Sequence, residues 1–347
     1  MISEPAIIGF EPGSGAWRAV LHRLRRDRVA VGCAALVVVF ALVEIAVAVG
    51  WLARNWQDEV AIPYAPPGLA GHPQAASPEA GGGHAGPSAQ APADIADIDP
   101  LAPRKSEWQS VGRTAGGQGN AREAVRPLGA DRLGRDLLAK TLQGGKTSIF
   151  VGVVGALVTV AIGTLLGALA GYYGGWVGDV LEWLYNVFES IPSLLLIFAL
   201  AAVLARGTAT VVVILALTGW TGLYRAVRAE YLRHRTRPYV LSAAALGVSN
   251  RDRIFRHILP NVSHVILVRL SLLVVAFIKA EVILSFLGFG VPAGDVSWGT
   301  MIAESQSEIL AGRWWQLVDA GVPMALFVTA FSMFTDSLRD AMDPRLQ

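Results

Sequence analysis

Long apolar runs separated by polar segments set the pattern of this chain. Six of them are long enough to cross about 30 Å of hydrocarbon as helices, at 29–53, 149–172, 178–205, 209–227, 264–290 and 316–337. A soluble domain does not need so many runs of this length to build its core. The pattern therefore predicts an all-α polytopic membrane protein with six transmembrane helices.

Composition strengthens that prediction. Hydrophobic residues make up 53% of the 347 residues and charged residues 16%, which overrides the two soluble domains that length alone would suggest. The lone cysteine, Cys33, lies inside an apolar run, so an intramolecular disulfide or a cysteine-based zinc cluster is excluded. We expect no metal or cofactor in this chain and no nucleic-acid partner.

The segment 1–28 is basic and precedes the first apolar run, 29–53. That run is longer than the core of a signal peptide, which has about 7–15 residues, and no small-residue cleavage motif closes it. We therefore expect 29–53 to be a retained first transmembrane helix. Its basic flank, 1–28, is expected in the cytoplasm, where arginine-rich flanks remain.

The segment 54–127 is a hydrophilic insert that is rich in proline, glycine and alanine. It has too few large apolar residues to offset the entropy lost on ordering, so we expect it to be largely flexible. The topology places it outside the cytoplasm. Its two histidines, His72 and His84, are expected to be solvated rather than to hold a metal.

Arginines orient the rest of the chain. Counting spans from a cytoplasmic N-terminus returns the loop 228–263 to the cytoplasm, and this loop carries Arg228, Arg233, Arg235, Arg237, Arg251, Arg253 and Arg256. The C-terminal tail, with Arg339 and Arg345, falls on the same side. Both chain ends are therefore expected in the cytoplasm.

The segment 128–148 reads as an amphipathic surface segment, and its ending, Gly-Gly-Lys-Thr-Ser, is reminiscent of a phosphate-binding loop. Such a loop requires a glycine at the place that Lys140 occupies, and also a preceding strand. The sequence therefore excludes nucleotide binding here.

Glycines recur every four residues in the run 149–172, at Gly163, Gly167 and Gly171. On a helix this spacing puts them on one face, where the absence of side chains lets another helix approach closely. The sequence leaves open whether that helix belongs to this chain or to a partner.

The polar segment 239–261, inside the loop 228–263, has an unusual design for a connecting loop. Small residues predict a short helix that Gly247 ends, and a second short helix over 252–259 is expected to stop at Pro260. Two short helices at an angle would make a rigid knob that another protein can grip. The candidate docking residues are Tyr239, Leu241, Ser242, Ala243, Ala244, Gly247, Arg251, Asp252 and Pro260. The alternative is an ordinary basic loop.

This segment resembles the cytoplasmic loop of importer-type ABC permeases, which carries Glu-Ala-Ala, three residues and Gly. Leu241, Ser242, Ala243 and Gly247 occupy those positions, with Leu241 in place of the usual glutamate. Further segments are similar to the C-type subunit of the dipeptide, oligopeptide and nickel permeases: LGADRLGRDLL (128–138), GTLLGALAGYYGGWV (163–177), IPSLLL (191–196), LSFLGFGVP (284–292), SWG (297–299) and LRDAMDPRL (338–346).

The resemblance implies a type I ABC importer-like fold, with a permease core over 128–347 that contains five of the spans. It implies a bacterial cytoplasmic-membrane complex with a sister permease, two cytoplasmic ATPases that bind ATP and Mg, and an extracytoplasmic binding protein. Catalysis would lie outside this chain. Short peptides are the expected cargo, with nickel chelates or peptide-like antibiotics as alternatives. An ion-driven secondary transporter is the alternative from another class.

Ionisable residues inside spans need a specific reason because charge is costly in hydrocarbon. Glu189 precedes Pro192, which can break a helix locally, so a carboxylate there could meet the charged end of a peptide. Glu281 is a second candidate for the translocation pathway. For Glu189 the alternative is a structural hydrogen bond to a neighbouring helix, and for Glu281 a structural or interface role is favoured.

Overall fold

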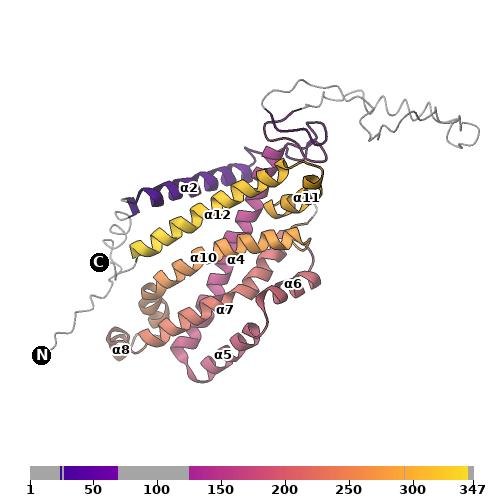
Figure 1. The fold of residues 1–347 in the computed structure, drawn as a ribbon. Coiled ribbons are helices and arrows are strands. Elements are labelled where there is room, and N and C mark those ends of the chain that lie inside the picture. The colour runs from indigo at the N-terminus through magenta and orange to yellow at the C-terminus, as the bar shows by residue number, and fades with distance from the viewer. Residues whose placement is uncertain (1–23, 26, 69–124, 293, 343–347) are drawn as a thin grey trace, which may run out of the picture. The chain divides into compact units, whose positions relative to one another are not determined.

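The computed structural model describes residues 24–25, 27–68, 125–292 and 294–342. Its helices in chain order, most of which Figure 1 labels, are α2 (Arg28–Ala48), α4 (Leu137–Tyr173), α5 (Gly175–Glu189), α6 (Ser193–Val203), α7 (Thr208–His234), α8 (Pro238–Ala245), α9 (Asn250–Asp252), the π-helical segment η2 (Arg253–Ile258), α10 (Leu259–Phe286), α11 (Trp298–Leu310) and α12 (Trp315–Met342). Within the described ranges only isolated β-bridges accompany the helices. The all-α prediction is confirmed.

Contacts divide the chain into two compact units. The larger consists of Met1–Arg54 and Thr141–Gln347, and the smaller of Asn55–Lys140. The insert 54–127 was predicted to be largely flexible, but most of it, including His72 and His84, lies outside the described residues.

Several helices meet the requirements of a membrane span. In the described part of the chain, four are long and apolar enough: Arg28–Ala48, Leu137–Tyr173, Thr208–His234 and Trp315–Ala341. The pair α5 and α6 makes a fifth if it counts as one broken span. The polytopic prediction is confirmed: five predicted runs fall on these helices, and the sixth, 264–290, falls on α10, which is not among these candidates.

The predicted run 178–205 is not one continuous helix. Helix α5 ends at Glu189 and α6 begins at Ser193, with the two axes bent by 84°. Pro192 is the residue immediately before α6, where its missing N–H does no harm. Helix α6 has 11 residues, or about 17 Å of length, which is too short to cross a bilayer alone.

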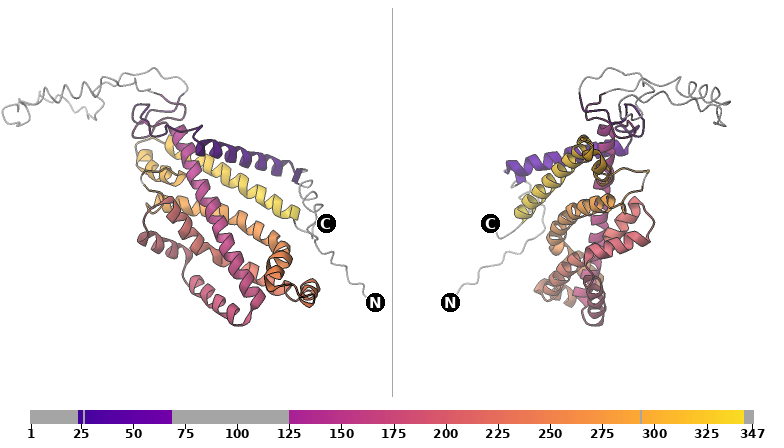
Figure 2. Two further views of the ribbon diagram at one scale, coloured as in Figure 1. Left: turned by 180° about the vertical axis from the view of Figure 1, so that it is seen from behind. Right: turned by 45° about the vertical axis from the view of Figure 1, so that its right-hand side comes forward.

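Helix α4 lies across α7 and α10, as both views in Figure 2 show. A Cβ atom added at Gly167 would lie 2.7 Å from the carbonyl oxygen of Tyr224, and one at Gly171 would lie 2.6 Å from that of Arg228. Gly163 approaches the Trp220 carbonyl in the same way, at 3.0 Å. The glycine face therefore packs on α7 of the same chain, which settles the choice that the sequence left open.

Helices α2 and α12 run side by side in Figure 1. The rings of Phe40 and Phe327 meet edge to face between them, with centroids 5.3 Å apart. The other face of α2 presents Val38, Val39, Leu42 and Ile45 as exposed apolar side chains. Such a face suits contact with lipid.

The smaller unit is held together by a buried ion pair. The Lys140 ammonium donates to Asp131 at 2.9 Å, and both side chains are almost fully buried. The other oxygen of Asp131 accepts the backbone N–H groups of Leu133 and Arg135. The residues 128–148 are thus a tight turn followed by the start of α4, rather than the surface segment that we predicted. Residues 144–148 lie within α4, where helical hydrogen bonds occupy the backbone groups that a phosphate loop would present.

We expect Gly167→Ala to destabilise the protein because its methyl group overlaps the α7 backbone. Overpacking of this kind costs about 1–3 kcal/mol, so the melting temperature in detergent, followed by tryptophan fluorescence, should fall by roughly 3–10 °C. Gly222→Ala in α7 is the matched control, since nothing lies within 4 Å of its added Cβ. Equal melting temperatures for the two variants would contradict this packing.

Candidate functional site

The loop between α7 and α10 begins with a short, sharply ended helix. Helix α8 starts at Pro238, and Gly247 follows its end with φ +78°. The N–H of Val248 donates to the carbonyl of Ala243 at 3.0 Å, and the N–H of Gly247 donates to Ala244 at 3.0 Å. This pair of bonds is a Schellman motif, which favours glycine at the left-handed position. Gly247 ends the helix, as predicted.

The second part of the loop differs from the prediction. Ser249 caps α9, which continues without interruption through η2 into α10, and Pro260 lies in the first turn of α10 instead of stopping a helix. The proline ring is accommodated because the wide π-helical turn precedes it, with the N–H of Leu259 donating to Ile254 five residues back. The second helix therefore runs directly into α10.

The cap at Ser249 carries a charged network. The Ser249 hydroxyl accepts from the N–H of Asp252 at 3.1 Å and donates to the Asp252 carboxylate at 2.6 Å. This hydrogen bond lowers the pKa of Asp252, and Arg256 at 3.3 Å acts in the same direction. An ionised carboxylate is favourable at a helix N-terminus. Arg251 lies beside this network and is exposed.

The loop is fixed to the helices by a buried apolar cluster and two tyrosines. The cluster consists of Ala168, Leu223, Val227, Tyr231, Val240, Ile254, Ile258 and Val262, which come from α4, α7, α8, η2 and α10. The Tyr231 hydroxyl donates to the Ile254 carbonyl at 3.1 Å. Tyr239 contacts His234 at 2.9 Å and accepts from Asn261 at 3.5 Å, while burial raises the pKa of its phenol. The loop is consequently fixed to α4, α7 and α10.

The outward surface of the loop is small and apolar. Ala243 is buried, whereas Ser242 is exposed and Ala244 is half-buried. Leu241 is 56% exposed and Leu246 is 83% exposed. A partner that grips this surface would meet leucine side chains rather than a carboxylate.

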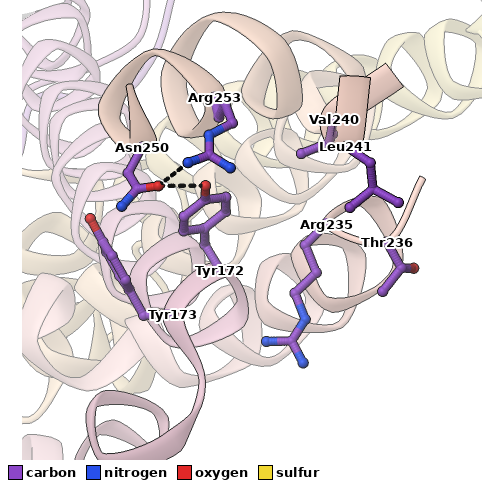
Figure 3. A pocket seen from close by; sticks show the side chains of 8 residues that line it. All are labelled: Tyr172, Tyr173, Arg235, Thr236, Val240, Leu241, Asn250 and Arg253. Carbon is purple, nitrogen blue, oxygen red and sulfur yellow. Dashed lines mark hydrogen bonds between the residues drawn. The ribbon is translucent and has the colours of Figure 1, made fainter. Parts of the chain in front are cut away.

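A pocket of about 400 Å³ lies between the loop and the ends of α4 and α7 (Figure 3). Asn250 is central to one side of it, because its Oδ1 atom accepts from the Tyr172 hydroxyl at 3.0 Å and also from the Arg253 guanidinium. The Arg253 guanidinium also lies over the Tyr172 ring, 5.8 Å from the centroid. Sequence reasoning missed Tyr172 and Arg253 as a pair, because nothing local connects the end of one span with a loop far along the chain.

The two pathway candidates have opposite environments. Glu189 and Pro192 are exposed at the bend between α5 and α6. Glu281 is fully buried, where the hydroxyls of Ser148 and Ser285 each donate to its carboxyl group at 2.7 Å. The placement of Glu281 supports the structural alternative.

The contacts of Glu281 extend to the start of α11. Ser148 also accepts from the backbone N–H of Trp298 at 3.2 Å, and Ser297 forms a capping box with Thr300. The carboxyl group of Glu281 thus joins α4, α10 and α11. The serines were not predicted; Ser148 lay in the rejected phosphate-loop motif, and Ser285 lay in LSFLGFG.

Two more carboxylates have protein neighbours. Glu182 in α5 pairs with Arg228 at 3.1 Å and accepts from the Tyr224 hydroxyl at 3.3 Å, which ties α5 to α7. Glu44 in α2 is buried, and a Cβ atom at Gly145 would lie 2.4 Å from its Oε1 atom. Glu44 therefore faces α4 of this chain.

The known proteins that are similar to this chain are membrane components of transport systems. A family model described as binding-protein-dependent transport system inner membrane component matches residues 163–347. The dipeptide transport system permease protein DppC of Bacillus subtilis is 38% identical over 220 residues, which cover 63% of this chain and 69% of that protein. The oligopeptide transport system permease protein OppC of the same organism is 36% identical over 220 residues, covering 63% and 72%.

Two further known proteins are similar to this chain. The oligopeptide transport system permease protein OppC of Mycobacterium bovis is 38% identical over 220 residues, covering 62% of this chain and 75% of that protein. A solved structure of the MetNI methionine ABC transporter in an inward facing conformation aligns with a TM-score of 0.48 and 14% identity, covering 59% of this chain and 96% of that one.

We expect Glu281→Ala to destabilise the protein strongly because it leaves a cavity and two buried hydroxyls without their acceptor. Losses of this kind are about 2–5 kcal/mol, so the melting temperature in detergent should fall clearly, and Glu281→Gln should recover part of it. Glu189→Ala, at an exposed carboxylate, should melt like wild type. A Glu281→Ala variant that melts normally but fails in transport would contradict the structural role.

Proposed function

Because the chain belongs to the family of binding-protein-dependent transport system inner membrane components, we propose that it is the permease subunit of an ABC importer for short peptides. The observation that carries this proposal is the family match over 163–347. The match includes the whole loop between α7 and α10, within 228–263, which we call the docking loop. Peptide cargo is supported by relatives described as dipeptide and oligopeptide transport system permease proteins. The chain is a permease component and not the catalytic subunit.

The proposed complex lies in the inner membrane. A sister permease would complete the translocation pathway, and two cytoplasmic ATPases would supply the energy of ATP·Mg hydrolysis. A binding protein would deliver cargo on the opposite face, where the insert 54–127 lies in this topology. The arginines of the loop 228–263 support a cytoplasmic docking loop and cytoplasmic chain ends.

The docking loop is built to transmit force. An ATPase that closes on the exposed face of α8 would push on Leu241 and Leu246, while Val240 and Ala243 are buried beneath. The buried cluster under the loop joins it to α4, α7 and α10. Because η2 runs into α10 without a break, displacement of the loop would tilt α10 as a whole and alternate access to the pathway.

The bend at Pro192 is the proposed contact region for cargo. Glu189 is an exposed carboxylate at a broken helix in a candidate span, and it can attract the ammonium group of a peptide. Glu281 would contribute indirectly, by holding α11 against α4 and α10.

We expect Gly247→Asp to release the ATPases, because a charged side chain would project from the docking surface. Wild type purified from its own membranes should carry a sister permease and ATPases, and the variant should retain the permease while losing most of the ATPases. Gly312→Asp is the matched control, since Gly312 has the same φ of +78° and equally open surroundings but lies after α11.

The same purification separates the competing function. Recovery of wild type without ATPases, under conditions that preserve known complexes, would favour an ion-driven secondary transporter. Transport of labelled dipeptides and of nickel chelates by the intact complex would then decide between the cargo classes.

A further inference from the structure

The pocket in Figure 3 has cationic and hydroxyl groups but no acidic side chain in its lining. Arg235 and Arg253 approach it from different elements, the end of α7 and η2. Tyr172 and Tyr173 form a second wall at the end of α4, and Thr236 lies beside Arg235. A lining of two guanidinium groups without a carboxylate has a positive potential.

The donors of these arginines are incompletely used. The Nε–H of Arg253 is buried and has no hydrogen-bond partner in the part of the chain that the structure describes. Among the described residues, Arg235 donates only to the Gly171 carbonyl, at 3.5 Å. Neither guanidinium forms an ion pair within the described ranges. A buried donor without an acceptor is costly, so an acceptor from outside the chain would stabilise this arrangement.

We propose that this pocket binds a phosphate or phosphodiester anion. A phosphate oxygen is the acceptor that fits, because planar guanidinium groups donate in pairs to such oxygens. The tyrosine and threonine hydroxyls can donate to the remaining oxygens. The volume of about 400 Å³ accommodates a lipid headgroup as well as a free phosphate.

The position of the pocket points to an anionic phospholipid as the source. Helices α4 and α7, whose ends line it, are both candidate membrane spans, and the apolar run 149–172 of α4 ends at the pocket tyrosines, which places this end of α4 near the headgroups. Basic pockets between such helices bind anionic lipids, and tyrosines gather at the same depth. Leu246, the most exposed apolar residue of the docking loop, does not line the pocket, but Leu241 does, so this site adjoins the surface proposed for the ATPase and shares Leu241 with it.

The test uses native mass spectrometry of the full-length chain titrated with phosphatidylglycerol or phosphatidylcholine. Wild type should retain one phosphatidylglycerol at concentrations where phosphatidylcholine does not bind. The double variant Arg235→Gln with Arg253→Gln should weaken that binding about tenfold, as expected for lost charge-assisted bonds. Inorganic phosphate is added in a second arm. Its binding at the same arginines, without a preference for phosphatidylglycerol over phosphatidylcholine, would assign the soluble anion.

A second pair of variants tests the pocket without removing an arginine. Thr236→Glu should place a carboxylate beside Arg235 and compete with the anion, whereas Thr236→Gln has similar size and should bind like wild type. Melting temperatures check that all variants are folded. The proposal is overturned if wild type binds neither anion, or if the double arginine variant keeps full phosphatidylglycerol affinity. If the double arginine variant lost its co-purified ATPases while its lipid binding stayed unchanged, the proposal would likewise be overturned. The pocket would then be assigned to the protein interface.

Discussion

The close approach of α4 to α7 is the contact on which the rest of the larger unit depends. It exists because Gly163, Gly167 and Gly171 leave the carbonyl oxygens of α7 within reach of the α4 backbone, and no other residue type fits there without displacement. This contact brings the end of α4 beside the docking loop, so that Tyr172 reaches Asn250 and Ala168 joins the buried cluster. A packing detail inside the spans thereby determines the geometry of a surface outside them.

Local rules predicted the parts of the fold that local chemistry decides. Gly247 ends a helix because its left-handed conformation is intrinsic to glycine, and Pro192 interrupts a span because its ring forbids a helical bond. Pro260 does not end a helix, because the π-helical turn before it accommodates the proline ring. The sequence does not reveal that turn. The arginine pocket and the bond from Ser148 to Glu281 depend on residues far apart in the chain, and single-sequence patterns carry no information about such pairs.

The two carboxylates Glu189 and Glu281 illustrate how environment separates residues of one type. Both lie in candidate or predicted spans, and both became candidates because charge is costly in hydrocarbon. Glu281 has hydroxyl donors from two helices and no exposed surface, which makes it a structural bridge. Glu189 has an exposed carboxylate at a helix end, which leaves its charge available. The two carboxylates differ in whether hydrogen-bond donors surround them, and not in whether they lie in a span.

The break before α6 has a consequence for the surrounding solvent. The first-turn N–H groups of α6 begin after Pro192 without a side-chain cap, and helical bonding alone leaves such groups unsatisfied. Hydrocarbon cannot supply acceptors, so non-helical backbone at membrane depth is tolerated only where protein or water borders it. Lipid tails are therefore excluded from this side of the bend, which either protein or water must border.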